Sequence, residues 1–145
     1  MIVDIACNNV RSLTNDISFG LFYQPLVIQT LNIYFDDKIV ETTDTYCSYD
    51  GYSEKSLTRY EIKSRRCSYK QFDTTIVPIH KDKNLDGHRL VFVFKFTDSL
   101  YYIEYNEMIF ETFDIKPITY YRQDYEAKPV NHYHIPIKYL TKIEI

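Results

Sequence analysis

Cysteine is scarce in this sequence, and its pattern argues against two classes of small protein. The three cysteines are an odd number and form no Cys-x-x-Cys pair, so neither a disulfide framework nor a cysteine zinc site is expected. We expect free thiols in a reducing, intracellular compartment at Cys7, Cys47 and Cys67.

Long apolar runs are also missing. No segment approaches the ~20 apolar residues that a membrane-spanning helix needs. Near the N-terminus, Asp4 and the pair Asn8 and Asn9 interrupt any apolar stretch, which argues against a secretory signal peptide. The sequence therefore predicts a protein that neither crosses a membrane nor is secreted.

Positive charge is not in excess. The chain has 17 Lys and Arg residues against 20 Asp and Glu residues, a formal net charge of −3. This balance argues against a protein that binds nucleic acid over its whole surface. Residues 54–70 differ, because they hold six basic residues and only two acidic ones. A local basic patch of this kind can still dock a phosphate backbone.

Tyrosine, by contrast, is abundant. The 15 Tyr and 9 Phe residues favour half-buried, pleated surfaces, so the composition predicts a protein rich in strands. The length is typical of one domain, expected to span residues 1–145. The patterns predict a helix over residues 17–35 that begins anew near Pro25, an alternating strand over 57–63, a central apolar strand over 90–96, and a hairpin from it to residues 100–105.

The most specific pattern lies between Asp50 and Lys63. Asp50 and Gly51 form a turn signal, and Glu61-Ile62-Lys63 follows on the alternating strand. Because side chains alternate along a strand, Glu61 and Lys63 are expected on one face. Mg²⁺ prefers oxygen ligands and keeps several waters, so the carboxylates of Asp50 and Glu61 and the carbonyl of Ile62 suit it.

These residue types indicate metal-dependent hydrolysis of a phosphodiester, with Mg²⁺ or Mn²⁺ as the cofactor. The Lys63 ammonium could orient the attacking water or stabilise the developing negative charge. Arg65 and Arg66 follow and could contact the scissile or a neighbouring phosphate.

The acid-x-Lys pattern alone is weak evidence. On the pattern alone, an exposed strand face with a cross-strand ion pair, worth ~0.2–1 kcal/mol, is the favoured interpretation. The pattern occurs three more times, at Asp36 and Lys38, Asp114 and Lys116, and Glu126 and Lys128.

A known nuclease family carries the same combination. The chain resembles the PD-(D/E)XK superfamily at Asp50 and over the stretch Tyr60-Glu-Ile-Lys-Ser-Arg-Arg66. Residues 91–105 also look like uncharacterised members of this group in large DNA viruses, and the resemblance covers roughly residues 16–106.

The resemblance implies an α/β fold in which a central mixed β-sheet is flanked by helices, the restriction-endonuclease-like αβββαβ core. It implies a Mg²⁺-dependent endodeoxyribonuclease with Asp50, Glu61 and Lys63 as catalytic residues, and with Asp50 and Glu61 as metal ligands. The expected partner is DNA, and cutting both strands suggests a homodimer, because a two-fold pair matches duplex symmetry. The expected location is the cytoplasm or a viral factory.

An alternative stays open: a catalytically inactive protein of the nuclease fold, or a β-rich viral binding or structural protein. The acidic net charge favours this alternative. Many members of the family carry an extra Glu on the first helix, and this chain has no Glu before Glu41. Thr74, Thr75, Ile76 and Val77 also disfavour a helix after the lysine.

A separate candidate lies at His132 and His134. The two imidazoles are expected on one strand face and could form a metal pair. No third ligand is evident nearby in the sequence, so surface histidines are the favoured interpretation.

Overall fold

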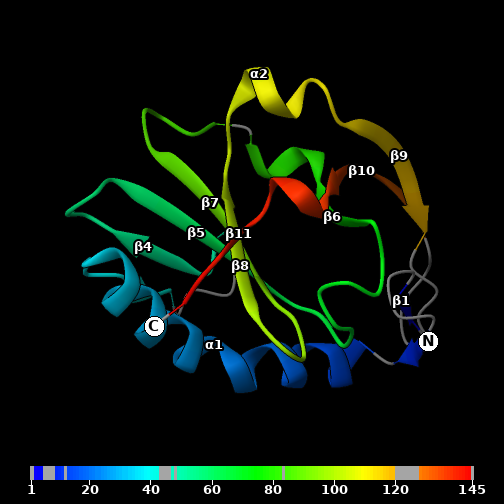
Figure 1. Cartoon of the computed structure of the whole chain (residues 1–145), viewed down its shortest axis with the longest axis horizontal. Coiled ribbons are helices and arrows are strands. Elements are labelled where there is room, and N and C mark those ends of the chain that lie inside the picture. The colour runs from blue at the N-terminus through cyan, green and yellow to red at the C-terminus, as the bar shows by residue number, and fades with distance from the viewer. Residues whose placement is uncertain are drawn as a thin grey trace.

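The computed structural model describes residues 2–4, 9–11, 13–42, 47, 49–82, 84–119 and 128–144, with side chains from residue 22 onward. Within these ranges the chain has a mixed α/β fold in which strands predominate (Figure 1). In chain order the elements are β1 (Ile2–Asp4), β2 (Asn9–Arg11), α1 (Leu13–Phe35), β3 (Val40–Glu41), β4 (Gly51–Ser53), β5 (Thr58–Ser64), β6 (Thr74–Pro78), η1 (Ile79–Asp82), β7 (Arg89–Lys95), β8 (Leu100–Glu104), α2 (Glu107–Phe110), β9 (Asp114–Thr119), β10 (Pro129–Pro136), η2 (Ile137–Tyr139) and β11 (Thr141–Lys142).

A mixed six-stranded sheet forms the centre of the fold, as the sequence predicts. Its strand order is β11-β8-β7-β5-β4-β3, and β5 and β7 run parallel while the other neighbouring pairs run antiparallel. The apolar strand β7 lies between β5 and β8, and Leu90 to Phe94 are all buried. The predicted central strand and its hairpin to β8 are both confirmed.

Helix α1 packs on one face of this sheet. Val27, Ile28 and Leu31 are buried against Tyr60 and Ile62 of β5, and Figure 1 shows the helix running alongside the sheet. Neither α1 nor any other helix in the described part of the chain has the length and apolarity of a membrane span.

The helix does not begin anew at Pro25, because Pro25 lies inside it. The prediction of a break at proline was therefore wrong. Packing of the buried side chains on the sheet offsets the backbone hydrogen bond that proline removes. The helix ends as predicted at Asp36, which adopts the left-handed conformation with φ of 50° that commonly terminates helices.

A second sheet, of order β6-β10-β9, covers the opposite face. Val77 of β6 and Ile135 of β10 are fully buried against Phe92 and Phe94 of β7. The central sheet is therefore flanked by a helix on one side and by strands on the other, rather than by helices on both sides. The β-branched run 74–77 accounts for this difference, because such residues favour pleated surfaces.

Candidate active site

Asp50 lies directly before β4, and its backbone is fixed on both sides. Its N–H donates to the carbonyl of Tyr60 at 2.9 Å, and its carbonyl accepts from the N–H of Thr42 at 2.9 Å. The predicted turn at Asp50-Gly51 was wrong: Gly51 is the first residue of β4, and the turn between β4 and β5 spans residues 54–57.

Gly51 serves packing rather than turning. A Cβ atom at this position would lie 2.9 Å from Cγ2 of Ile39 and 3.7 Å from Cδ1 of Ile28 on α1. Only glycine allows β4 to approach Ile39, which follows α1, this closely. The lack of a side chain at Gly51 therefore helps to place the neighbouring Asp50.

The Asp50 side chain reaches across to β5. Its Oδ2 accepts a hydrogen bond from the backbone N–H of Ile62 at 2.7 Å. Ile62 stands between Glu61 and Lys63, so this bond holds the Asp50 carboxylate beside the Glu-x-Lys segment. The sequence-predicted carboxylates are thus brought together from two adjacent antiparallel strands.

Glu61 and Lys63 share one face of β5, as their spacing of two residues on a strand predicts. The Lys63 ammonium lies 3.0 Å from Oε1 of Glu61, and the Glu61 side chain is only 6% exposed. Tyr60 and Ile62 point the other way, into the core under α1. Glu61 and Lys63 therefore face the second sheet.

A second lysine, which sequence reasoning missed, also reaches Glu61. Lys81 lies on η1 and its ammonium is 3.3 Å from the same Oε1 atom. The neighbouring Asp82 accepts a hydrogen bond from the hydroxyl of Tyr133 at 2.7 Å, which ties η1 to β10. Two carboxylates and two ammonium groups thus gather in the site, and their formal charges balance.

Burial and charge both act on Asp50. Burial raises the pKa of this carboxyl to about 6, and the nearby Glu61 carboxylate adds to the effect. The hydrogen bond from Ile62 and the charges of Lys63 and Lys81 oppose the rise in pKa without cancelling it. A raised pKa in a cluster of charged groups is typical of functional sites.

The oxygen atoms present suit a hard cation such as Mg²⁺. The N–H and C=O of one strand residue point to the same edge of the strand. The N–H of Ile62 donates to Asp50, so its carbonyl oxygen lies on the same edge of β5. This part of the edge is not paired with β4, because β4 begins only at Gly51. Among the described residues no group of three or more His, Cys, Asp or Glu side chains is placed to hold a metal. A metal here would therefore rely on two carboxylates, a main-chain carbonyl and waters, which Mg²⁺ accepts.

The two predicted phosphate-binding residues continue from the same strand. Arg65 donates through Nη2 to the carbonyl of Ile76 on β6 at 2.5 Å, and its guanidinium lies 5.8 Å from the ring centre of Phe94. Arg66 lines a pocket at the end of β5 together with Lys95. Both arginines are partly buried rather than fully exposed.

His132 is not a surface residue, so the favoured interpretation of it was wrong. It is 1% exposed, and its Nδ1 lies 2.7 Å from the carbonyl of Val130, to which it donates its proton. Burial lowers the pKa of His132, and the positive charges of Arg65 and Lys63 lower it further. The ring is therefore a neutral group next to the candidate site. No local pattern in the sequence indicates its burial, because β10 is enclosed by its pairing with β6 and β9.

The remaining acid-x-Lys copies do not form comparable sites. Asp114 and Lys116 are exposed on β9, and Asp36 and Lys38 are exposed where α1 ends. Glu126 lies outside the described residues. Of the predicted thiols, Cys47 and Cys67 form no disulfide within the described part of the chain, and Cys7 lies outside the described residues.

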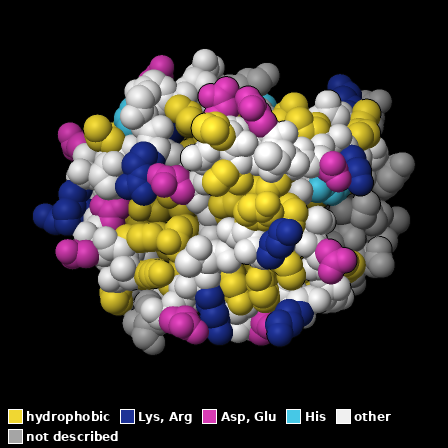
Figure 2. Space-filling view, turned by 45° about the horizontal axis from the view of Figure 1, so that its top comes forward, with side chains coloured by type: hydrophobic (Ala, Val, Ile, Leu, Met, Phe, Trp, Pro, Cys, Tyr) yellow, Lys and Arg dark blue, Asp and Glu magenta, His cyan; other side chains and the backbone are white. Residues whose placement is uncertain are grey.

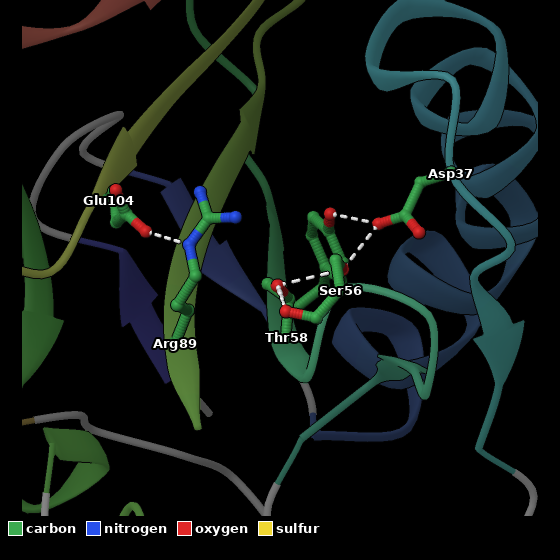
Figure 3. Close-up of polar contacts among 6 residues, drawn as sticks. Asp37, Ser56, Thr58, Arg89 and Glu104 are labelled. Atoms are coloured by element: carbon green, nitrogen blue, oxygen red, sulfur yellow. Dashed lines mark hydrogen bonds and ion pairs between the residues drawn. The ribbon is translucent and has the colours of Figure 1, made fainter. Parts of the chain in front are cut away.

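A second polar cluster surrounds Asp37 at the opposite end of β5 (Figure 3). The Asp37 carboxylate accepts hydrogen bonds from Ser53, Ser56 and Tyr60 at 2.5 to 2.8 Å. Although burial opposes ionisation, these donors hold the pKa of Asp37 below its usual value. A carboxylate so well provided with donors ties the end of α1 to the β4–β5 turn, and we assign it a structural role.

The charge on the surface is mixed. On the face shown in Figure 2, basic and acidic side chains alternate around apolar ones and do not gather into one basic field. Contact of this face with a polyanion would therefore rely on a local group of cations and not on a continuous basic surface.

Comparison of the chain with protein-family models, with curated proteins and with solved structures gives no match. The functional interpretation therefore depends on the geometry of the site.

Proposed function

We propose that this chain is a metal-dependent endonuclease that hydrolyses phosphodiester bonds in DNA, with Asp50, Glu61 and Lys63 as its catalytic residues. One observation carries the proposal. The Asp50 carboxylate is bonded to the amide between Glu61 and Lys63, so two carboxylates and an ammonium converge from adjacent strands. An exposed ion pair on a strand face would require neither the buried Glu61 nor the raised pKa of Asp50.

The order of elements supports membership of the PD-(D/E)XK superfamily. A helix, α1, precedes the antiparallel strands β3, β4 and β5, and the parallel strand β7 follows. Asp50 lies directly before β4, and Glu61 and Lys63 lie in the second half of β5. The chain departs from the αβββαβ pattern between β5 and β7, where β6 and η1 replace the second helix.

The carboxylates of Asp50 and Glu61, with the carbonyl oxygen of Ile62, would hold Mg²⁺ or Mn²⁺. When bound, such an ion supplies a Lewis acid for the phosphate and lowers the pKa of a bound water. Lys63 contributes its own charge: its ammonium lies 3.0 Å from Oε1 of Glu61, beside a carboxylate that would hold the metal. A fixed ammonium stabilises negative charge that develops there and needs no reorganisation during the reaction.

The proposed working form is a homodimer that cuts the two strands of a duplex. Helix α1 offers a surface for the second copy, because Phe22, Leu26 and Ile33 are 70%, 56% and 64% exposed. The helix holds no charged residue after Asp16. In a two-fold contact, the same surface of each subunit packs against its counterpart in the other subunit. A charged surface would therefore face like charge, which an uncharged apolar surface avoids.

A nicking assay tests the nuclease. Supercoiled plasmid is incubated with the protein and Mg²⁺ or Mn²⁺, and the rate of nicking is compared with that of Lys63→Ala. We expect the substitution to lower the rate by about 100-fold or more, because it removes a fixed charge from the site.

Lys116→Ala is the matched control, because it removes the lysine of an exposed acid-x-Lys copy on β9. Its nicking rate should equal that of the wild type. If the wild-type protein fails to nick DNA in the presence of Mg²⁺ and also in the presence of Mn²⁺, the proposal is contradicted. That result would favour the catalytically inactive binding protein of the nuclease fold.

A further inference from the structure

A small pocket lies where the parallel strands β5 and β7 end together. Ser64 and Lys95 are paired in the β5–β7 ladder, so the residues that follow β5 meet those that follow β7. The pocket has a volume of about 140 Å³, and its described lining is Tyr23, Arg65, Arg66, Lys95, Phe96 and Thr97. Three of these six residues carry positive charge, and none of them carries negative charge.

The cations of this pocket are held in place by the protein itself. The Arg65 guanidinium is fixed by the carbonyl of Ile76 and lies over Phe94. The Lys95 ammonium donates to the carbonyl of Phe96 and lies 5.2 Å from the ring centre of Tyr23. Neither of these contacts involves a carboxylate. The carboxylate of Asp98 interacts electrostatically with Lys95, but it is exposed to solvent, so both cations remain available to an anion.

One polar atom of the pocket lining also lacks an acceptor. Nε of Arg65 is buried and has no hydrogen-bond partner in the described part of the chain. A buried donor that is left unsatisfied destabilises the fold. A bound anion that accepts from Arg65 would remove this penalty.

The position of the pocket relative to the candidate active site suggests its ligand. Lys63 lies near the end of β5, and Arg65 directly follows the strand, two residues or about 6.6 Å further along an extended chain. The pocket therefore follows directly from the lysine that would face the scissile phosphate. Its size suits one small anionic group.

We propose that the pocket of Arg65, Arg66 and Lys95 binds one phosphate group of the nucleic acid, next to the phosphate that is cleaved. This inference rests on the proposed nuclease function for its substrate, and it adds Lys95 as a binding residue that the sequence did not indicate. The phosphate is either a monoester at a strand end or a diester within the strand. Both present the same oxygens to the guanidinium groups, which bind phosphate through charge-assisted hydrogen bonds.

Binding of inorganic phosphate tests the pocket without any cleavage. The dissociation constant is measured calorimetrically at constant ionic strength in the Asp50→Asn background, and compared with that of the same protein carrying Lys95→Gln. We expect Lys95→Gln to weaken binding about tenfold, because one charge-assisted contact is lost.

Lys55→Gln is the matched control, because Lys55 is exposed in the turn at the other end of β5. This variant makes the same change of charge and should bind phosphate like its parent. Arg66→Gln provides a second test of the pocket, with circular dichroism to verify that each variant is folded. Equal phosphate affinity in the parent, Lys95→Gln and Arg66→Gln would overturn the proposal.

Oligonucleotides that carry or lack a terminal phosphate distinguish the two sources. If the terminal phosphate strengthens binding and Lys95→Gln removes the gain, the ligand is a strand end. If Lys95→Gln weakens both oligonucleotides equally, the ligand is an internal diester. If the protein nicks plasmid but binds no phosphate in this pocket, only the inference about the pocket is contradicted. If it binds phosphate in the pocket but does not nick plasmid, the phosphate site is retained and the proposed nuclease function is contradicted.

Discussion

The carboxylate of Asp50 and the backbone N–H of Ile62 are joined by a hydrogen bond of 2.7 Å. This bond crosses from the start of β4 to the middle of the Glu61-Ile62-Lys63 segment, where the ladder between the two strands has ended. It sets the distance between the first carboxylate and the other candidate catalytic groups. It also places a carboxylate where burial and Glu61 both disfavour its ionised form.

We predict that Asp50→Asn abolishes cleavage and makes the protein more stable at pH 7. The folded-state pKa of about 6 lies above the usual 3.8, so ionisation opposes folding. The penalty is absent below about pH 3.8, grows as the pH rises, and is complete above about pH 6. A shift of about two pKa units corresponds to up to about 3 kcal/mol.

Urea unfolding of both proteins at pH 7 and at pH 4 measures this effect. The increase in the free energy of unfolding caused by Asp50→Asn should be large at pH 7 and small at pH 4. Asp86→Asn is the control, because Asp86 has a 78% exposed side chain, and its gain should be near zero at both pH values. A gain from Asp50→Asn that does not change with pH would exclude the raised pKa as its cause.

Protons should compete with the metal at Asp50. The carboxyl must lose its proton to bind a cation, so the affinity for Mn²⁺ should level off above about pH 6. Below that pH it should fall by about tenfold per pH unit. Titration of Mn²⁺ by electron paramagnetic resonance between pH 5 and pH 8 would measure the curve. Affinity that is constant down to pH 5 would show that Asp50 is not a ligand.

Lys63 and Lys81 should act together on stability. Each ammonium contacts Oε1 of Glu61, so removing one leaves the carboxylate with the other. Lys63→Met or Lys81→Met alone should therefore destabilise the fold by about 1 kcal/mol. The double variant leaves a buried carboxylate without a cation, which should destabilise the fold by about 3–5 kcal/mol.

A double-mutant cycle, measured by urea unfolding, gives the coupling directly. In the Glu61→Gln background the coupling should vanish, because no buried charge remains to be paired. Strict additivity in the Glu61 protein would mean that the two lysines do not share the carboxylate in solution.

The oligomeric state should depend on the exposed apolar residues of α1. Leu26→Glu places a charge against its own copy in a two-fold contact, so we expect the protein to become a monomer. Light scattering coupled to size-exclusion chromatography would measure the mass. Met108→Glu on α2 makes the same change at a residue that is 80% exposed, and it should leave the dimer intact. A wild-type protein that is monomeric at high concentration would contradict the proposed dimer.

Local patterns predicted the parts of the fold that depend on local geometry. The shared face of Glu61 and Lys63 follows from the two-residue period of a strand, and the burial of β7 follows from its continuous apolar run. Pro25 inside α1 was missed because tertiary packing outweighs the local preference of proline.

The parts of the site that depend on long-range packing could not be derived from the sequence. Lys81 reaches Glu61 from η1, which the hydrogen bond from Tyr133 to the neighbouring Asp82 ties to β10, about fifty residues further along the chain. His132 is buried for the same reason, since its strand pairs with both β6 and β9. Lys95 joins Arg65 and Arg66 through the parallel register of β5 and β7, which no local pattern specifies.

The tight contact between Gly51 and Ile39 has a consequence for mutational libraries of this chain. A screen that selects only for folding should reject every side chain at position 51, although the residue has no chemical group to contribute. The same screen should accept, and even enrich, neutral substitutions at the adjacent Asp50. Under selection for folding, position 50 would then tolerate substitution and position 51 would not. Only a screen for cleavage would reject substitutions at both positions.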